Sequence, residues 1–326
     1  MKKPICAIAA LVFLIFFGVQ SSFSYEFKIE NLTAALAGDS RSPSLNNYGS
    51  VAWATFTDGN NIDVYVDGVN ITPETYNEFN GSPSLNDSGN VAWQRSFSAN
   101  SPLSGTEQVI FEHDIVAGGN YYHAGRPQLN NQGQLAWMQW TGVDWDVFFE
   151  GFNLTQDLPG AARFLSLNDN GDVAWTHYYN NSYTLYLNGV SQFSTPFELG
   201  AVFINNSGQI AWTQSSGVQN ENDVYLDGVN LTPQAGGHAA VMGLNDLGQV
   251  AWSGFDGANY DIFLDGFNLT SEFPYLAFSP SLNNRGQIAW SMGEDIYLAT
   301  PVPEPSTLIL LMSGIVGFIL LKRFRP

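Results

Sequence analysis

Side chains that can do acid, base or metal chemistry occur in this sequence, but not at the spacings such chemistry needs. The four histidines form no His-Glu-x-x-His pair, and no Gly-x-Ser-x-Gly segment marks a nucleophilic serine. We therefore expect a protein that is not an enzyme, with no catalytic residue, metal or cofactor. We also expect all the histidines to lie on the surface or in loops. They are His113, His123, His177 and His238.

Aspartates recur at one place in a repeated segment, at the start of a short apolar strand. They are Asp63, Asp146, Asp223, Asp261 and Asp295. A ring of carboxylates could bind calcium, but one carboxylate per repeat places the five side chains far apart. We therefore expect them to form hydrogen bonds within turns.

Aromatic side chains in the variable segments are the best candidates for a binding site. These segments mix aromatic rings with Asn, Asp, Gly and Ser, which suits stacking and hydrogen bonding on sugar rings. Ordinary loop composition explains the same pattern equally well. The segments span residues 56–61, 96–108, 140–145, 178–183, 215–222 and 255–260. The predicted ligand-facing residues are Trp140, Trp145, Tyr178, Tyr179, Tyr183, Phe255, Asp256 and Tyr260.

A phrase repeated seven times defines the framework that must position these residues. It reads Leu or Ile, Asn, Asn or Asp, any residue, Gly, any residue, a branched apolar residue, Ala and Trp, and its first copy spans residues 45–53. Successive tryptophans are 37 to 44 residues apart, a period typical of a repeat-built domain. The copies end at Trp53, Trp93, Trp137, Trp175, Trp212, Trp252 and Trp290.

Each repeat predicts four antiparallel strands. The Asn-x-Gly segment is typical of the turn between the first two strands, and a later Asp-Gly pair is typical of a type I′ turn between the last two. That pair occurs at Asp67-Gly68, Glu150-Gly151, Asn188-Gly189, Asp227-Gly228 and Asp265-Gly266, and in looser form at Ala117-Gly118-Gly119.

The second strand is apolar on both faces. In the first repeat, Val51 and Trp53 point to one side and Ala52 to the other. A four-stranded sheet that is covered on both faces, repeated every 40 residues or so, is typical of a propeller blade. We therefore expect the small alanine to admit the neighbouring sheet and the tryptophan to be core.

The two ends of the repeat array predict how the fold closes. The fourth strand carries Asn-Leu-Thr or Asn-Ile-Thr, but the seventh repeat stops at Leu298 without it. Residues 28–33, before the first repeat, contain the missing Asn31-Leu32-Thr33. We therefore predict an all-β fold, a seven-bladed β-propeller closed by an N-terminal strand.

Two segments of the last repeat support a family resemblance. Residues 283–290 (Asn-Asn-Arg-Gly-Gln-Ile-Ala-Trp) and residues 295–298 (Asp-Ile-Tyr-Leu) resemble the repeats of TolB-type, PD40-like propellers. The turn phrase is also similar to HAF-type extracellular repeats. The resemblance covers about residues 28–298 and implies the propeller fold. It implies little about activity, because propellers have many functions.

Charge and cysteine content exclude some classes of function. Residues 25–301 carry 29 acidic and 6 basic residues, a net charge of −23. Such a surface repels nucleic acid and anionic membranes. The single cysteine, Cys6, precedes this region, so we expect neither disulfides nor thiol chemistry in it.

Both termini predict export. Residues 1–24, with Lys2, Lys3 and an apolar stretch, are typical of a signal peptide with a helical core. Residues 302–326 contain Pro303, Glu304 and Pro305, a 15-residue apolar run and a basic cluster. This order resembles the PEP-CTERM sorting signal, although a plain hydrophobic membrane helix is the simpler interpretation.

The resemblance to the sorting signal implies processing by an exosortase in a Gram-negative-type bacterium. It also implies a transient anchor in the inner membrane, followed by release to the cell envelope or the extracellular surface. In such bacteria the signal accompanies exopolysaccharide and biofilm production. Membrane contact is then expected only through residues 302–326, before processing.

Three functions fit the predicted propeller of residues 25–301. The first is binding of polysaccharide or of a surface protein through the variable loops. The second is a polysaccharide-active lyase or glycosidase, which needs paired carboxylates or converging His, Tyr and Arg side chains. Asp256 with Asp144 or Glu107 is the conceivable carboxylate pair. The third is a purely structural matrix protein.

Overall fold

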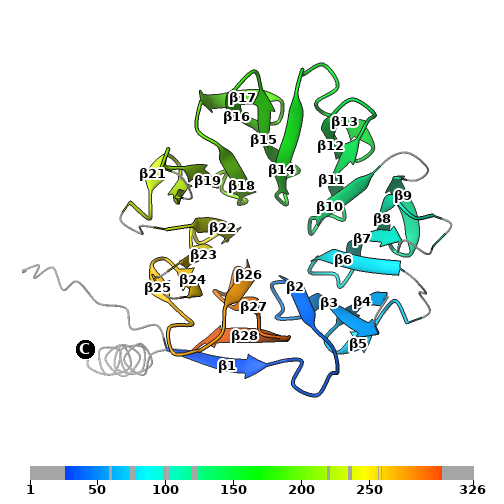
Figure 1. Cartoon of the computed structure of the whole chain (residues 1–326), viewed down its shortest axis with the longest axis vertical. Coiled ribbons are helices and arrows are strands. Elements are labelled where there is room, and N and C mark those ends of the chain that lie inside the picture. The colour runs from blue at the N-terminus through cyan, green and yellow to red at the C-terminus, as the bar shows by residue number, and fades with distance from the viewer. Residues whose placement is uncertain are drawn as a thin grey trace, which may run out of the picture.

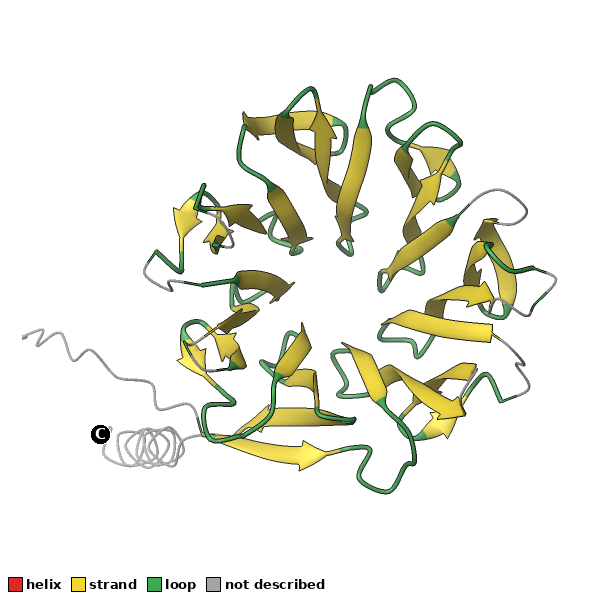
Figure 2. Ribbon diagram, in the orientation of Figure 1, coloured by secondary structure: helices red, strands yellow, loops and turns green. Residues whose placement is uncertain are grey.

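The computed structural model describes residues 26–58, 61–73, 78–97, 101, 103–118, 123–218, 221–233, 237–255, 257 and 259–302. These residues form strands, turns and loops only (Figure 2). None of them belongs to a helix that could span a membrane. The expected signal helix and C-terminal hydrophobic helix lie outside the described residues.

The strands follow one another in order around a central axis (Figure 1). The first strand and the strands of the first two repeats are β1 (Phe27–Asn31), β2 (Ser40–Leu45), β3 (Val51–Asp58), β4 (Asn61–Val66), β5 (Val69–Asn70), β6 (Glu78–Leu85), β7 (Val91–Phe97), β8 (Glu107–Phe111) and β9 (Asp114–Gly118). Those of the third and fourth repeats are β10 (Ala124–Leu129), β11 (Leu135–Trp140), β12 (Trp145–Phe149), β13 (Phe152–Asn153), β14 (Ala161–Leu167), β15 (Val173–Tyr179), β16 (Ser182–Leu187) and β17 (Val190–Thr195). Those of the last three repeats are β18 (Leu199–Ile204), β19 (Ile210–Ser215), β20 (Asn222–Leu226), β21 (Val229–Asn230), β22 (Ala239–Leu244), β23 (Val250–Phe255), β24 (Tyr260–Leu264), β25 (Phe267–Asn268), β26 (Ala277–Leu282), β27 (Ile288–Met292) and β28 (Asp295–Pro301).

The strands form antiparallel meanders arranged like the blades of a propeller. Five sheets have four strands, and one sheet has eight. The eight-stranded sheet contains the first two repeats, whose meanders meet at one parallel residue pair between β4 and β6, Ile62 and Phe79. The all-β propeller architecture expected from the repeat is therefore confirmed.

The repeated tryptophans are core residues, as the sequence predicts. All seven are at most 6% exposed. In six repeats the tryptophan stacks on the aromatic side chain directly across from it on the third strand, with interplanar angles of 7° to 17°. Trp53 and Tyr65 are such a pair. In the second repeat the partner of Trp93 is Ile110.

The alternation of faces explains how neighbouring sheets pack. Val51 and Trp53 belong to one apolar cluster with Ala289 of the last repeat. Ala52, on the opposite face, lies in the next cluster with Trp93 of the second repeat. Each small alanine thus meets the large tryptophan side of a neighbour, which fills the space between sheets without overpacking.

The turns between the third and fourth strands have the expected conformation, with one correction. Asp67 and Gly68 have φ values of 48° and 83°, as a type I′ turn requires. In the second repeat the turn lies at Glu112 and His113, with φ values of 50° and 71°, and not at Ala117-Gly118-Gly119. The prediction was wrong because it sought glycine, whereas two non-glycine residues adopt the left-handed conformation here.

The recurring aspartates do not act within turns, which corrects a second expectation. Asp146 at the start of β12 accepts hydrogen bonds from Asn153 Nδ2 (2.7 Å) and Thr155 Oγ1 (2.7 Å). Thr155 Oγ1 in turn accepts the backbone N–H of Val147 (3.1 Å). This Asp-Asn-Thr cluster fastens the short fourth strand to the third. The repeated Asn-x-Thr segments are therefore structural.

The N-terminal strand closes the ring as predicted. β1 pairs antiparallel with β28, and the sheet order is β1-β28-β27-β26. Asn31 and Thr33 donate to the Asp295 carboxylate at 2.8 and 2.7 Å, which reproduces the same cluster between the two ends of the repeat array. The backbone N–H of Ile296 donates to Thr33 Oγ1 at 2.9 Å.

Seven buried asparagines link the repeats on the inside of the ring. In each, the side-chain oxygen accepts two backbone N–H groups of its own turn, as Asn46 does from Tyr48 and Ser50. Its Nδ2 donates to the backbone carbonyl of the equivalent asparagine in the next repeat, at 2.9 to 3.2 Å. The cycle closes from Asn283 back to Asn46.

The closing cluster can be tested with Thr33→Val, which removes the hydroxyl and keeps the side-chain shape. The half-buried Asp295 carboxylate loses a donor and the buried Ile296 N–H loses its acceptor. We expect a loss of about 1–3 kcal/mol in the free energy of unfolding, measured by urea denaturation. The control is Thr184→Val, whose hydroxyl pairs with Ser194 at an exposed edge, with an expected change within about 0.5 kcal/mol. Equal effects of the two substitutions would contradict the role of this cluster.

Candidate functional site

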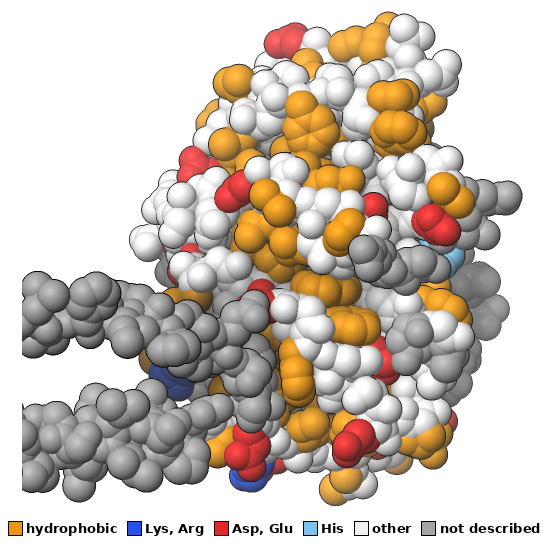
Figure 3. Space-filling view, turned by 90° about the vertical axis from the view of Figure 1, so that its left-hand side faces the viewer, with side chains coloured by type: hydrophobic (Ala, Val, Ile, Leu, Met, Phe, Trp, Pro, Cys, Tyr) orange, Lys and Arg blue, Asp and Glu red, His pale blue; other side chains and the backbone are white. Residues whose placement is uncertain are grey.

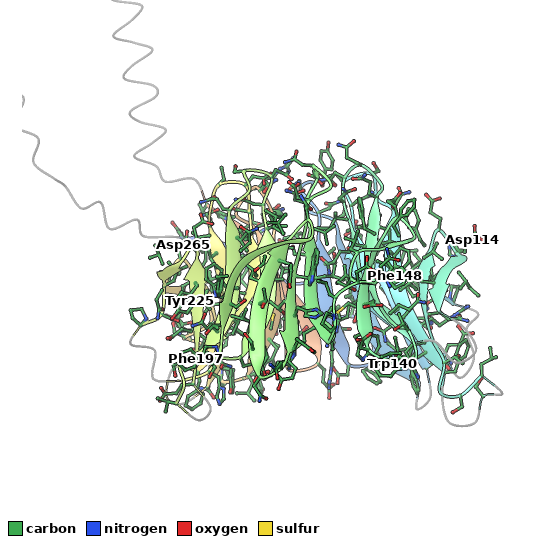
Figure 4. All side chains as sticks on the ribbon, turned by 90° about the horizontal axis from the view of Figure 1, so that it is seen from above. Asp114, Trp140, Phe148, Phe197, Tyr225 and Asp265 are labelled. Atoms are coloured by element: carbon green, nitrogen blue, oxygen red, sulfur yellow. The ribbon has the colours of Figure 1, made fainter. Side chains whose placement is uncertain are left out.

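The two faces of the disc differ as the strand order predicts. One face carries the short turns, such as the one at Asp265, and the other carries the loops near Trp140 and Phe197 (Figure 4). The outer edge of the disc shows more acidic than basic side chains (Figure 3). We call the two surfaces the turn face and the loop face.

On the turn face, a small axial cavity of about 160 Å³ is lined by a ring of amides and carboxylates. The residue after each buried asparagine donates its backbone N–H to the side chain of its counterpart in the next repeat, at 2.7 to 2.8 Å. Asp169 also accepts from the side chains of Asn131 and Asn206. These carboxylates are occupied by structural bonds, and no group of three or more His, Cys, Asp or Glu in the described ranges could hold a metal.

On the loop face, most of the predicted aromatic residues form cross-strand pairs. Trp140 pairs with Trp145, Tyr178 with Tyr183, and Phe255 with Tyr260, each pair closing a hairpin between the second and third strands of its repeat. Their ring centroids lie 6.1, 4.7 and 5.5 Å apart. Tyr179, next to the second pair, is exposed.

These residues divide between two regions of the loop face. Trp145 and Tyr178 line one cavity. Phe255 and Tyr260 belong to a separate aromatic group, in which Tyr260 lies 5.8 Å from Phe278. Asp256 lies outside the described residues.

The cavity that contains Trp145 and Tyr178 has a volume of about 640 Å³ and spans three neighbouring repeats. Its walls combine aromatic and apolar side chains with a few polar and charged ones, as ligand sites generally do. The lining residues are Gln94, Glu107, Gly125, Arg126, Met138, Trp145, Ala161, Ala162, Arg163, Phe164 and Tyr178.

Two arginines at this cavity were not predicted from the sequence. Arg126 Nη1 donates to the backbone carbonyl of Arg163 at 2.6 Å, and its guanidinium lies 4.9 Å from the centre of the Phe164 ring. Arg163 contacts the Glu198 carboxylate at 2.8 Å and donates to Tyr183 Oη at 3.3 Å. Partial burial, followed by the charge of Arg163, lowers the pKa of Arg126. The sequence signal that could have found them is the scarcity of basic residues: Arg126 and Arg163 are two of only six in the propeller.

Groups capable of acid and base chemistry also lie at this cavity. The Glu107 carboxylate is 3.5 Å from His123 Nδ1. Asp144, the other predicted partner of Asp256, caps its own hairpin by accepting from Thr141. Of the residues named for the conceivable carboxylate pair, Glu107 lines the cavity, and Asp256 lies outside the described residues.

The histidines do not all lie on the surface. His177 on β15 is 3% exposed, and its Nε2 lies 3.0 Å from the carbonyl oxygen of Pro159. The expectation was wrong for this residue because β15 extends beyond the tryptophan and remains buried there. His113 packs edge-on against Trp93 at 5.6 Å.

Comparison with known proteins shows what each part of the chain is similar to. Residues 301–323 match the PEP-CTERM protein-sorting motif. The chain is therefore an exported protein, transiently anchored in the membrane at its C-terminus and processed by an exosortase. Pro303, Glu304 and Pro305 fall within the match but outside the described residues. No curated protein sequence matches the chain.

The solved structures with similar folds are distant in sequence. A streptogramin B lyase has a TM-score of 0.50 and 11% identity, over 85% of this chain and 98% of that one. A puromycin hydrolase has a TM-score of 0.56 and 12% identity, over 80% of this chain and 51% of that one. The propeller domain of the Trilobed protease from Pyrococcus furiosus has a TM-score of 0.47 and 10% identity, over 82% and 83%.

These similarities overturn the expectation that the protein is not an enzyme. Structures that share the fold include the streptogramin B lyase and the puromycin hydrolase, at 11% and 12% identity. The absence of familiar catalytic spacings was therefore not a sound reason to exclude catalysis. Identities this low show the shared fold and leave the activity of this chain open. The TolB-type and HAF-type resemblance stays a prediction.

The loop face also contains a carboxyl group with a raised pKa. Glu78, at the start of β6, has a buried Oε2 that lies 3.8 Å from Arg95 Nη1. Burial is the main cause that raises the pKa of Glu78; Asp63 raises it further and Arg95 opposes the shift. A carboxyl whose pKa is raised by folding reduces stability as the pH rises through that folded-state pKa.

Glu78→Gln should therefore stabilise the protein at neutral pH. The gain should shrink as the pH falls below the ordinary carboxyl pKa of about 4.3, where the wild-type carboxyl is protonated in both the folded and the unfolded protein. Urea denaturation at both pH values measures this, with the exposed Glu272→Gln as the control. A variant less stable than the wild type at neutral pH would mean that the Arg95 interaction outweighs burial.

Proposed function

We propose that this protein is an exported propeller that binds polysaccharide in the cavity of about 640 Å³ on its loop face. The observation behind this proposal is the convergence of Trp145, Tyr178 and Phe164 with Gln94, Arg126 and Arg163 around one concave site. Aromatic faces stack on the apolar faces of sugar rings, and the polar groups can bond their hydroxyls.

The shape of the site favours sugar over a surface protein as the ligand. Specific protein interfaces usually bury about 800 Å² on each partner. The residues that converge here line a concave cavity of about 640 Å³ rather than a broad contact surface. A cavity of this size fits a few sugar units of a chain that enters and leaves across the rim.

The site of action that we propose is the cell envelope or the extracellular matrix of a Gram-negative-type bacterium. Residues 1–24 would be removed as a signal peptide, and residues 302–326 would hold the chain in the inner membrane until exosortase processing. The match of residues 301–323 to the sorting motif supports this route. A contribution to exopolysaccharide retention and biofilm follows from polysaccharide binding at that location.

We further infer that residues 25–301 form seven blades. The eight-stranded sheet counts as two blades because one residue pair joins its two meanders. The closed cycle of seven asparagine hydrogen bonds supports the same number.

A polysaccharide-active enzyme is the second candidate. The observation that favours it is the Glu107 carboxylate at the cavity, 3.5 Å from His123 Nδ1, with Tyr178 lining the same cavity. Such groups can move protons in a lyase or glycosidase reaction. Binding alone needs no such pair.

Trp145→Ala should weaken polysaccharide binding. Losing a central aromatic contact costs about 2 kcal/mol in a typical interface, which is roughly a 30-fold loss of affinity. The measurement is affinity electrophoresis in gels that contain single polysaccharides. Phe152→Ala, at an exposed aromatic residue beside a turn on the turn face, is the control and should bind as the wild type. Unchanged binding by a folded Trp145→Ala protein would contradict the proposed site.

Enzymatic action is tested by incubating each polysaccharide that binds with the protein and measuring new reducing ends. The second candidate predicts their release by the wild type and a loss of at least about 100-fold with Glu107→Gln. Glu112→Gln, at an exposed turn of the same repeat, should leave the rate unchanged. No release from any bound polysaccharide would reject the enzyme and leave the binding proposal in place.

A further inference from the structure

We propose that Arg126 and Arg163 form a subsite for the carboxylate of an acidic sugar, so that the ligand is a polysaccharide containing uronic acid units. This inference rests on the proposed function and names the class of polysaccharide that the cavity selects. The reasons lie in the charge, the backbone conformation and the free donors of the two arginines.

The first reason is a local concentration of positive charge on an acidic protein. Residues 25–301 contain 6 basic residues against 29 acidic ones, and 2 of the 6 line this single cavity. Arg126 directly contacts the backbone of Arg163. The charge of Arg163 acts on Arg126, whose pKa it lowers, and a bound anion would reduce this repulsion.

The two arginines differ in how far their charge is already neutralised. Arg163 contacts Glu198, whereas no carboxylate of the described residues lies within ion-pair distance of Arg126. Partial burial, and after it the charge of the neighbouring Arg163, lowers the pKa of Arg126. A bound anion would therefore neutralise the charge of Arg126 more than that of Arg163.

The second reason is that the fold does not need an arginine at position 126. This residue lies in a β-bulge of β10 with φ of 55° and precedes a proline. Ser42, Ser82 and Ser279 occupy the equivalent bulges of three other repeats, with φ values of 49° to 56°, and also precede prolines. Serine satisfies this conformation in three other repeats, so the fold does not require the long charged side chain of Arg126.

The third reason is geometric. The Phe164 ring supports the Arg126 guanidinium from one side. One of its N–H groups is used by the carbonyl of Arg163, which leaves donors that can bind a carboxylate in a bidentate manner. Trp145 and Tyr178 line the same cavity and can hold the sugar ring that bears the carboxylate.

The experiment uses Arg126→Ser, which places in the third repeat the residue that three other repeats already have at this bulge. The matched control is Arg285→Ser, in a turn of the turn face where Ser88 and Ser207 occupy the equivalent positions. Both variants change the net charge by the same amount, so long-range electrostatics are equal. Affinities are measured by titration calorimetry for polygalacturonate, alginate, dextran sulfate and dextran.

The wild type should bind a uronate polymer more tightly than dextran or dextran sulfate. Arg126→Ser should weaken uronate binding at least about tenfold and leave dextran binding unchanged, because a charged hydrogen-bonded contact is lost. Arg285→Ser should stay within about twofold of the wild type.

Three outcomes would overturn the inference. Equal binding of dextran and uronates would show that the carboxylate is not recognised. Preference for dextran sulfate would replace carboxylate with sulfate as the recognised group. Equal effects of Arg126→Ser and Arg285→Ser on uronate binding would show that Arg126 does not contact the ligand. If the wild type binds none of these polymers or any other polysaccharide, the proposed function itself fails.

Discussion

A cycle of hydrogen bonds between buried asparagines is the constraint on which the rest of this structure depends. Each asparagine closes its own turn with one end of its amide and holds the next repeat with the other, so a single side chain satisfies three backbone groups that burial would otherwise leave unpaired. Because the cycle returns from Asn283 to Asn46, no repeat can shift without breaking bonds to both neighbours. The turn face is therefore fixed.

The loop face is free to vary because the turn face and the sheets already define the ring. Tryptophan and alanine fill the space between sheets, and the Asp-Asn-Thr cluster fastens the outer strand in five of the seven repeats. None of these groups requires a particular sequence at the loop-face ends of the strands, where the β10 bulge that contains Arg126 lies. Residues such as Arg126 can therefore differ from one repeat to the next without loss of the fold, which makes the loop face the place where a binding specificity can be built.

Much of this arrangement could be predicted from the sequence, because period and alternation report directly on burial. The core tryptophans and the closing strand with Asn31 and Thr33 follow from local patterns. The asparagine cycle, the role of Asp146 and the turn at Glu112 could not be predicted, since they depend on which residues meet across strands. The candidate site was predicted in part: Trp145 and Tyr178 converge on one cavity, whereas Phe255 belongs to another group.

The central claim is that the loop-face cavity formed by the second, third and fourth repeats is the ligand site of this exported propeller. A crystal structure of the protein with a bound trigalacturonate tests it most directly. The account predicts a sugar carboxylate within hydrogen-bond distance of Arg126 and Arg163, with a sugar ring against Trp145 or Tyr178. A trisaccharide bound instead beside Phe255 and Tyr260, or on the turn face, would contradict it.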